Sequence, residues 1–275
     1  SSGDTGEATI SPSQLTFTSG NWNSAQTVTV TGINDDLVDG TQTSTITMSV
    51  VDGNSDDSFD SLNDQTVSVT TADTDVAGFT IIESGGSTTV AESGTTDTFT
   101  VVLDAQPSSD VVISATSGDT GEASVSPSQL TFTSGNWDSA QTVTITGVDD
   151  SLIDGSQDTT ITMSVVDGSS DDSFDSLNDQ TVTVSTADND TAEFTVTQSG
   201  GSTSVDESGT TDTFTVVLDA QPTSNVVISV TSNDTTEATV SPSLLTFTSG
   251  NWDSAQTVTI TGADDNAVDG PQGTS

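Results

Sequence analysis

Polar and apolar residues alternate along most of the chain with a period of two. Residues 141–146, for example, read QTVTIT, which places Val143 and Ile145 on one side and three polar side chains on the other. This alternation is typical of a strand with one face in a core and one in water, and threonine suits a pleated sheet because it is β-branched. No stretch has a convincing helical period, so the pattern predicts an all-β protein.

A segment of 22 residues occurs three times at an offset of 115 residues. It occupies 11–32, 126–147 and 241–262, with two differences between the first and second copies and one between the second and third. A period near 115 residues is too long for a solenoid turn and is typical of a whole small domain. The sequence therefore predicts tandem copies of one domain type.

The offset divides the chain into three units. Residues 77–191 (unit two) form the complete copy, 1–76 (unit one) match its C-terminal part, and 192–275 (unit three) match its N-terminal part. Both partial units contain the SGNW segment, so they overlap, whereas a strand-swapped polymer would need clean complements. The simpler interpretation is an excerpt from a longer array.

Eight short strands are expected in unit two, separated by turns rich in Ser, Gly, Asn and Asp. Such spacing indicates a β-sandwich, and we expect a linear array of such sandwiches. The expected strands are 78–82, 88–91, 98–104, 111–116, 129–133, 141–147, 159–166 and 181–186. The expected core residues are Leu103, Val112, Leu130, Phe132, Trp137, Val143, Ile145, Ile161, Met163 and Val182.

The charge changes this picture most. The chain has 42 acidic residues and no lysine, arginine or histidine, so no side chain can neutralise a carboxylate. Nucleic acid and anionic membrane surfaces are excluded as partners, and no apolar run approaches the roughly 20 residues that span a bilayer. Without His, Cys, Lys, Arg or Tyr the usual catalytic groups are missing, so we expect no enzyme activity.

The acids gather in loops rather than in strands. Expected strands 129–133 and 141–147 contain none, whereas acidic clusters directly follow the strands that end at Gly147 and Thr186. Loops that leave strands of the same direction meet at one end of a sandwich. Two carboxylates about 4 Å apart repel by roughly 4 kcal/mol at an effective dielectric near 20. Converging acids therefore favour a bound cation, and oxygen ligands suit Ca²⁺. A solvated acidic surface is the alternative.

These residues carry a family resemblance. The landmarks are AGFTII, VAESG, TDTFTVVLDAQP, SGDTGEASVSPSQLTFTSGNW, AQTVTITGVDDSLIDG and TADND, in that order over 77–190. In order and spacing the unit resembles bacterial Calx-beta-like repeats, which are similar to immunoglobulin-like sandwiches and bind Ca²⁺ at one end.

The resemblance implies ligands from an early Glu, an Asp before the SPSQLTF segment, the DD loop and the terminal DxD. In unit one Asn34 aligns with Asp149, which replaces that carboxylate by an amide. The implied metal ligands are Asp4, Asp35, Asp39, Asp73, Asp75, Glu92, Asp119, Asp149, Asp150, Asp154, Asp188, Asp190, Glu207, Asp234, Asp264, Asp265 and Asp269.

A second acidic loop, residues 167–179 (DGSSDDSFDSLND), lacks the spacing and terminal Glu of an EF-hand. Phe174 and Leu177 are expected to pack it against the core. The sequence leaves open whether it holds an ion.

Two functions follow. The first is a calcium-stabilised segment of an extracellular or cell-surface bacterial fibre, adhesin stalk or matrix protein, with Ca²⁺ stiffening the junctions between neighbouring repeats. Other chains of the fibre and covalent glycans on Ser or Thr are further expected partners. The second is a glycan-, mineral- or ice-binding module that uses threonine-rich strand faces, such as Thr142, Thr144 and Thr146. Solvent-facing strands are the simpler interpretation of those faces.

Overall fold

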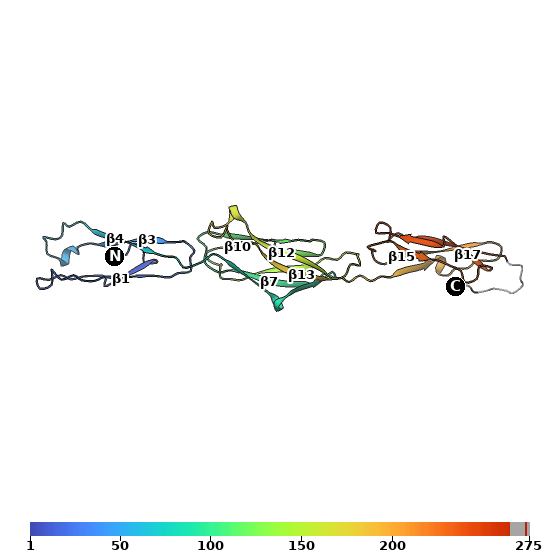
Figure 1. Ribbon diagram of the computed structural model, residues 1–275, viewed down its shortest axis with the longest axis horizontal. Coiled ribbons are helices and arrows are strands. Elements are labelled where there is room, and N and C mark those ends of the chain that lie inside the picture. Colours follow the sequence, from blue (N-terminus) through green and yellow to red (C-terminus); the bar gives the residue numbers. More distant parts are fainter. Residues whose placement is uncertain (265–272, 274–275) are drawn as a thin grey trace.

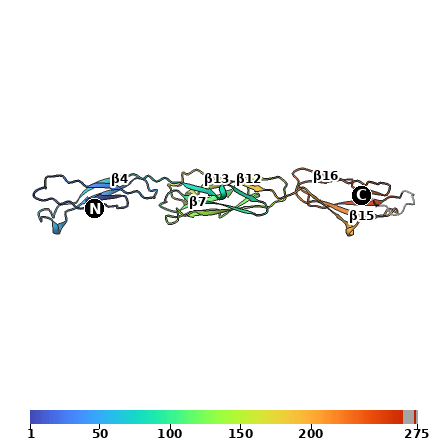
Figure 2. The ribbon, with the colours of Figure 1, turned by 90° about the horizontal axis from the view of Figure 1, so that it is seen from below.

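The protein is a long rod of β-sheets. The computed structural model describes residues 1–264 and 273, and its sheets follow one another along the horizontal axis in Figure 1. The view from below is equally narrow (Figure 2). The elements in this part of the chain are strands and four short 3-10 helices, so the predicted all-β class is confirmed.

Unit two contains a complete sandwich. One sheet has the strand order β10-β8-β12-β13-β6 and the other β5-β7-β11-β9. All neighbours are antiparallel except β13 and β6, which run parallel. The strands are β5 (Phe79–Glu83), β6 (Thr88–Ala91), β7 (Thr96–Leu103), β8 (Val111–Ser117), β9 (Ala123–Ser126), β10 (Gln129–Phe132), β11 (Gln141–Gly147), β12 (Gln157–Val165) and β13 (Gln180–Ala187), with 3-10 turns at Ser84–Gly86 and Asp167–Ser169.

Units one and three contain smaller sheets. Unit one has the pairs β1-β2 and β3-β4, and unit three has β14-β15-β19-β17 and β16-β18. The strands of unit one are β1 (Ala8–Ser11), β2 (Thr29–Gly32), β3 (Gln42–Met48) and β4 (Gln65–Thr71), with a 3-10 turn at Asp52–Asn54. Those of unit three are β14 (Phe194–Gln198), β15 (Thr211–Leu218), β16 (Val226–Ser229), β17 (Ala238–Ser241), β18 (Leu244–Phe247) and β19 (Gln256–Gly262), with a 3-10 turn at Ser199–Gly201.

All eight strands expected in unit two are present, and their ends shift by at most two residues. The structure adds β9, a strand of four residues that is absent from the expected set. Its sequence, ASVS, offers only one branched apolar residue, Val125, so the alternation is too short to recognise.

The core of unit two lies between its two sheets. Eight of the expected core residues are buried, and Trp137 is partly buried and packs against this core. Val112 was wrongly expected there. Its neighbours Val111 and Ile113 are buried, and period two therefore turns Val112 toward the outer face.

The same residue types are exposed in unit one. Phe132 and Phe174 are fully buried in unit two, whereas Phe17 and Phe59, their counterparts 115 positions earlier, are 53% and 55% exposed. The described strands of unit one include no counterparts of β5, β6, β7 and β8, which cover this face in unit two. Burial here is set by the partner strands and not by the residue itself.

Successive units touch through one loop. Leu37 of unit one forms a parallel bridge with Gln106 of unit two, and Leu152 of unit two forms one with Gln221 of unit three. In the described residues, no helix has the length and apolar character needed to cross a membrane.

Candidate metal centre

Six carboxylates of unit two come from the ends of four strands. Glu92 directly follows β6, Glu122 directly precedes β9, Asp150 and Asp154 lie in the loop after β11, and Asp188 and Asp190 follow β13. Among the described residues, two groups of acids place one oxygen per residue within 4.8 Å of one another, and both contain Glu92. The groups are Glu92, Glu122 and Asp150, and Glu92, Asp188 and Asp190.

Backbone pairing places Glu92. β6 runs parallel to β13 as far as the pair Ala91 and Ala187, and the Glu92 N–H then donates to the Ala187 carbonyl at 3.1 Å. The end of β11 crosses close by, since a Cβ on Gly147 would lie 2.1 Å from the Ala91 oxygen. Only glycine allows this approach. Glu92 is thereby 1% exposed.

Asp188 organises the loop after β11. Its Oδ2 accepts hydrogen bonds from the backbone N–H groups of Asp154 (3.2 Å) and Gly155 (2.8 Å), and its Oδ1 accepts one from Asp190 (2.7 Å). These bonds favour the charged form and lower the pKa of Asp188. Asp188 therefore joins the loop after β11 to the segment after β13.

Several buried oxygens of the centre have no partner. Glu122 Oε2, Asp154 Oδ1 and Asp190 Oδ2 are inaccessible to solvent and accept no hydrogen bond. Burial, with repulsion from Asp188, Asp150 and Asp154, raises the pKa of Glu92, and burial with the neighbouring acids also raises the pKa of Glu122 and of Asp190. A buried acceptor without a partner costs about 1–3 kcal/mol, and more when charged. A proton or a bound cation would offset this cost.

The donor set fits a hard cation. It consists of carboxylate oxygens, with no nitrogen or sulfur ligand, and Ca²⁺ takes six to eight such oxygens in a flexible arrangement. A divalent ion would both satisfy the orphaned oxygens and remove the mutual repulsion that raises the pKa values.

Asp119, one of the implied ligands of unit two, stabilises a turn and does not join either ligand group. Asp119 is exposed, and its Oδ1 accepts the Gly121 N–H at 2.9 Å. Asp4 and Asp234 hold the corresponding turns, by bonds to Gly6 and Thr236. The structure brings none of these three into a ligand group.

Asp149 also lies outside both groups. Its Oδ1 accepts a hydrogen bond from Asn189 Nδ2 at 2.9 Å. In unit one the same pair of positions holds Asn34 and Thr74, and Thr74 Oγ1 donates to Asn34 Oδ1, also at 2.9 Å. The position therefore needs an acceptor rather than a charge, which explains why an amide occurs there.

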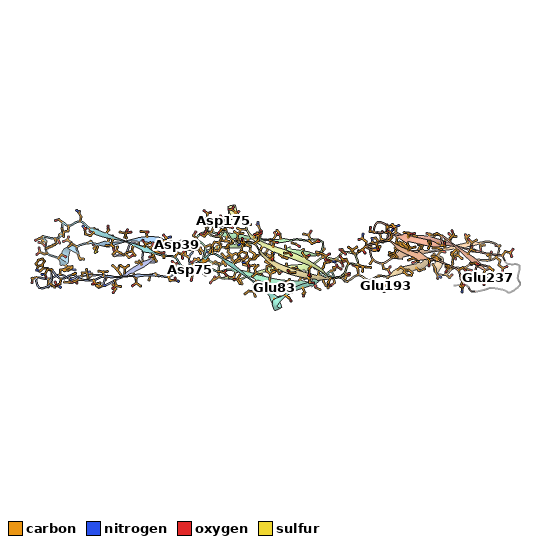
Figure 3. All side chains as sticks on the ribbon, in the orientation of Figure 1. Asp39, Asp75, Glu83, Asp175, Glu193 and Glu237 are labelled. Carbon is orange, nitrogen blue, oxygen red and sulfur yellow. The ribbon has the colours of Figure 1, made fainter. Side chains whose placement is uncertain are left out.

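Unit one repeats part of the centre. Asp73 Oδ2 accepts the N–H groups of Asp39 and Gly40, as Asp188 does for Asp154 and Gly155, and Asp35 Oδ1 accepts the Leu37 N–H at 3.0 Å. Asp39 and Asp75 lie at the end of unit one that faces unit two (Figure 3). No residue of the described chain takes the place of Glu92 here, and the acids of unit one form no ligand group.

Unit three differs at the glutamate. Glu207 is exposed, whereas Glu92 is buried. Asp264 follows β19 and is also exposed, and the expected ligands Asp265 and Asp269 lie outside the described residues. The centre is thus assembled only in unit two within the part of the chain that the structure describes.

Glu122 is the ligand candidate that the sequence analysis did not select. It stands three residues after Asp119 and is 9% exposed, and its backbone carbonyl accepts the Val148 N–H at 2.9 Å. The alternation of β9 does not reveal this burial, because Glu122 has the parity of the exposed Ser124 and Ser126 and not that of the buried Ala123.

The loop at 167–179 is held by hydrogen bonds. Burial acts to raise the pKa of Asp171, but hydrogen bonds from Ser108, Ser173 and Ser109 outweigh it and lower the pKa to about 2. Phe174 is fully buried and Leu177 packs against the core, as expected. Asp171 and Asp172 also line a polar cavity of about 760 Å³ shared with Asp39, Asp73 and Asp75 of unit one.

The threonine faces form regular rows. Thr142, Thr144 and Thr146 lie on the outer face of β11, opposite Thr100, Thr98 and Thr96 of β7. They line neither the cavity at Asp171 nor the smaller pocket around Asp73, and no aromatic residue stands in these rows. A binding role for them stays a prediction.

No protein-family model and no curated protein matches the chain. Solved structures resemble it in part. CBD12 from CALX1.2 is 17% identical, with coverage of 66% of this chain and 75% of that one and a TM-score of 0.28. The surface layer protein SbsC, domains 1–6, is 16% identical over 86% of this chain and 26% of that one, with a TM-score of 0.32. SSP-19, an MSP-domain protein like family member in Caenorhabditis elegans, is 16% identical over 37% and 92%, with a TM-score of 0.26.

Proposed function

We propose that the chain is a structural segment of an extracellular bacterial fibre, adhesin stalk or matrix protein whose sandwiches are stabilised by Ca²⁺ near the junctions. The role is mechanical and not catalytic. The observation that carries the proposal is the set of buried, unpartnered carboxylate oxygens around Glu92, contributed by Glu122, Asp154 and Asp190.

No group of the described residues donates a hydrogen bond to these oxygens, and the chain has no cationic side chain that could pair with them. Ca²⁺ bound there would join the ends of β6, β11 and β13 and the start of β9. Because the loop after β11 also touches unit three, an ion at this centre would stiffen the junction as well as the sandwich. The two ligand groups lead us to expect two ions, one per group.

Calcium titration of the chelator-treated protein tests the proposal. We expect saturable heat in calorimetry, a rise in melting temperature by circular dichroism, and a longer, less flexible particle in X-ray scattering. Mg²⁺ should stabilise less, because it keeps several of its waters and demands octahedral geometry. Absence of both heat and any thermal shift at millimolar Ca²⁺ would contradict the proposal.

A further inference from the structure

The loop that carries two acids of the centre is held from the next unit. We call residues 149–155 the cation loop. At its middle, the Ser151 carbonyl accepts the Gln221 N–H at 2.6 Å, and the Ile153 N–H donates to the Gln221 carbonyl at 3.4 Å. Near its ends, Asp150 Oδ1 accepts the Leu152 N–H at 2.6 Å and Asp188 binds the Asp154 N–H. One short loop therefore spans the metal centre and the junction.

The other junction repeats these contacts. The Gln106 N–H donates to the Asp36 carbonyl at 2.7 Å, and the Val38 N–H donates to the Gln106 carbonyl at 3.0 Å. Asp36 corresponds to Ser151, so the side chain in the loop changes while the backbone bonds remain. Because both backbone bonds persist whether the loop residue is Asp36 or Ser151, they depend on the position of the glutamine backbone and not on the loop side chain.

The glutamine side chain fixes that position. Gln221 Nε2 donates to the Ser249 carbonyl at 2.9 Å, and Gln106 Nε2 donates to the Ser134 carbonyl at 3.0 Å. The preceding alanines, Ala220 and Ala105, are 4% and 2% exposed. Each glutamine therefore ties a buried turn of its own unit to the loop before that unit's tryptophan, and it presents its backbone to the unit before.

We propose that Gln221 is a positioning residue for the cation loop of the preceding unit, an inference that rests on the proposed function. Gln221 does not touch the ion. It holds the cation loop at Ser151 and Ile153, between Asp150 and Asp154, in the arrangement that binds. By linkage, a contact that favours the binding arrangement raises cation affinity by the same factor by which the cation strengthens the contact.

The test compares two glutamines of unit three in the full chain. Gln221→Ala removes the bond to Ser249, and Gln256→Ala, the matched control, removes an equivalent amide bond to the Thr246 carbonyl (2.8 Å) away from the junction. Calcium affinity is measured by calorimetry, and the heat that disappears in Glu92→Gln is assigned to the centre of unit two. We expect Gln221→Ala to weaken that affinity about fivefold or more, within the usual range of coupling between sites. Gln256→Ala should leave it unchanged.

A second substitution protects the test against simple misfolding. Gln221→Met keeps the length of the side chain and removes the amide that donates to Ser249, so it should also weaken calcium binding while the calcium-free melting temperature stays near that of Gln256→Met. Equal affinity in the Gln221 and Gln256 variants would overturn the positioning role while leaving the proposed function intact. An unmodified chain that binds no calcium would overturn both.

Discussion

Glu92 and Glu207 stand at the same position of two almost identical segments, VAESG and VDESG, but they differ in burial. Glu92 is buried among five other carboxylates, whereas Glu207 is exposed. The difference lies in a distant strand. β6 forms in unit two by pairing with β13, and the described part of unit three contains no counterpart of β13 and no strand at 203–206.

This comparison separates what a segment encodes from what its neighbours supply. The apolar pattern before Glu92 makes a strand available, but the strand forms only when a parallel partner lies beside it. A ligand position inferred from a repeated motif therefore holds only where the whole set of strands is present. The following predictions test that dependence.

The largest effect is expected from removing the shared glutamate. Glu92→Gln keeps the shape of the side chain and removes its charge from both ligand groups. We expect calcium affinity of unit two to fall about a hundredfold, since truncating one member of a buried charged site typically costs about 2–5 kcal/mol. Calorimetry measures this, with Glu207→Gln as the control that should change nothing at this centre.

The calcium-free proteins should respond in the opposite sense. Glu92→Gln relieves repulsion with Asp150, Asp154 and Asp188, so its melting temperature without calcium should equal or exceed that of the unmodified chain. A variant that is less stable without calcium and still binds the ion would show that Glu92 serves packing alone.

A second contrast concerns Asp171 and its counterpart Asp56. Asp171 accepts bonds from the backbone N–H groups of Ser108 (2.8 Å), Ser109 (2.9 Å) and Ser173 (2.9 Å), whereas the exposed Asp56 accepts one from Ser58. Bonds to a charged group contribute about 1.5–3 kcal/mol. Asp171→Ala should therefore destabilise unit two by about 3 kcal/mol, and Asp56→Ala should leave the stability of unit one nearly unchanged. Hydrogen exchange of peptides from each unit measures both, and equal effects would contradict the comparison.

Much of the fold could be predicted from the sequence, and less of the site. Alternation located eight strands of unit two because Val, Ile and Thr repeat at every second position. It missed β9, where only Val125 marks the buried face, and it misplaced Val112 because two valines in succession hide the phase of the alternation. The convergence of Glu92 with Asp188 depends on parallel pairing between strands that are almost a hundred residues apart, which no local pattern encodes.

The pH dependence should distinguish the centre from the loop at Asp171. Without calcium, the raised pKa values of Glu92, Glu122 and Asp190 mean that the folded chain holds protons more tightly than the unfolded chain. Their contribution to stability is present below the ordinary carboxyl pKa and is lost as pH rises through the raised values. Asp171 acts oppositely, and its contribution is lost as pH falls from the ordinary aspartate pKa of 3.8 toward its lowered pKa of about 2.

Thermal unfolding in chelator across this pH range should thus show a loss of stability as pH rises toward neutral. The slope should flatten in Glu92→Gln. Saturating calcium should reverse the sign, because the ion requires deprotonated ligands. A calcium-free melting temperature that increases steadily through the same window would contradict the assignment.

The smallest effect is expected at Asp149. Its carboxylate serves as the acceptor for Asn189 Nδ2, a role that the Asn34 amide oxygen fills toward Thr74 in unit one. Asp149→Asn keeps an acceptor oxygen and removes one nearby charge, so calcium affinity should stay within about a factor of two of the unmodified chain, a change under about 0.5 kcal/mol. Asp149→Leu, which removes the acceptor, should loosen the link between the cation loop and Asn189 and weaken binding further. Calorimetry on the two variants decides whether Asp149 is a hydrogen-bond acceptor or a direct ligand. If it were a direct ligand, both substitutions would remove most of the protein's calcium affinity.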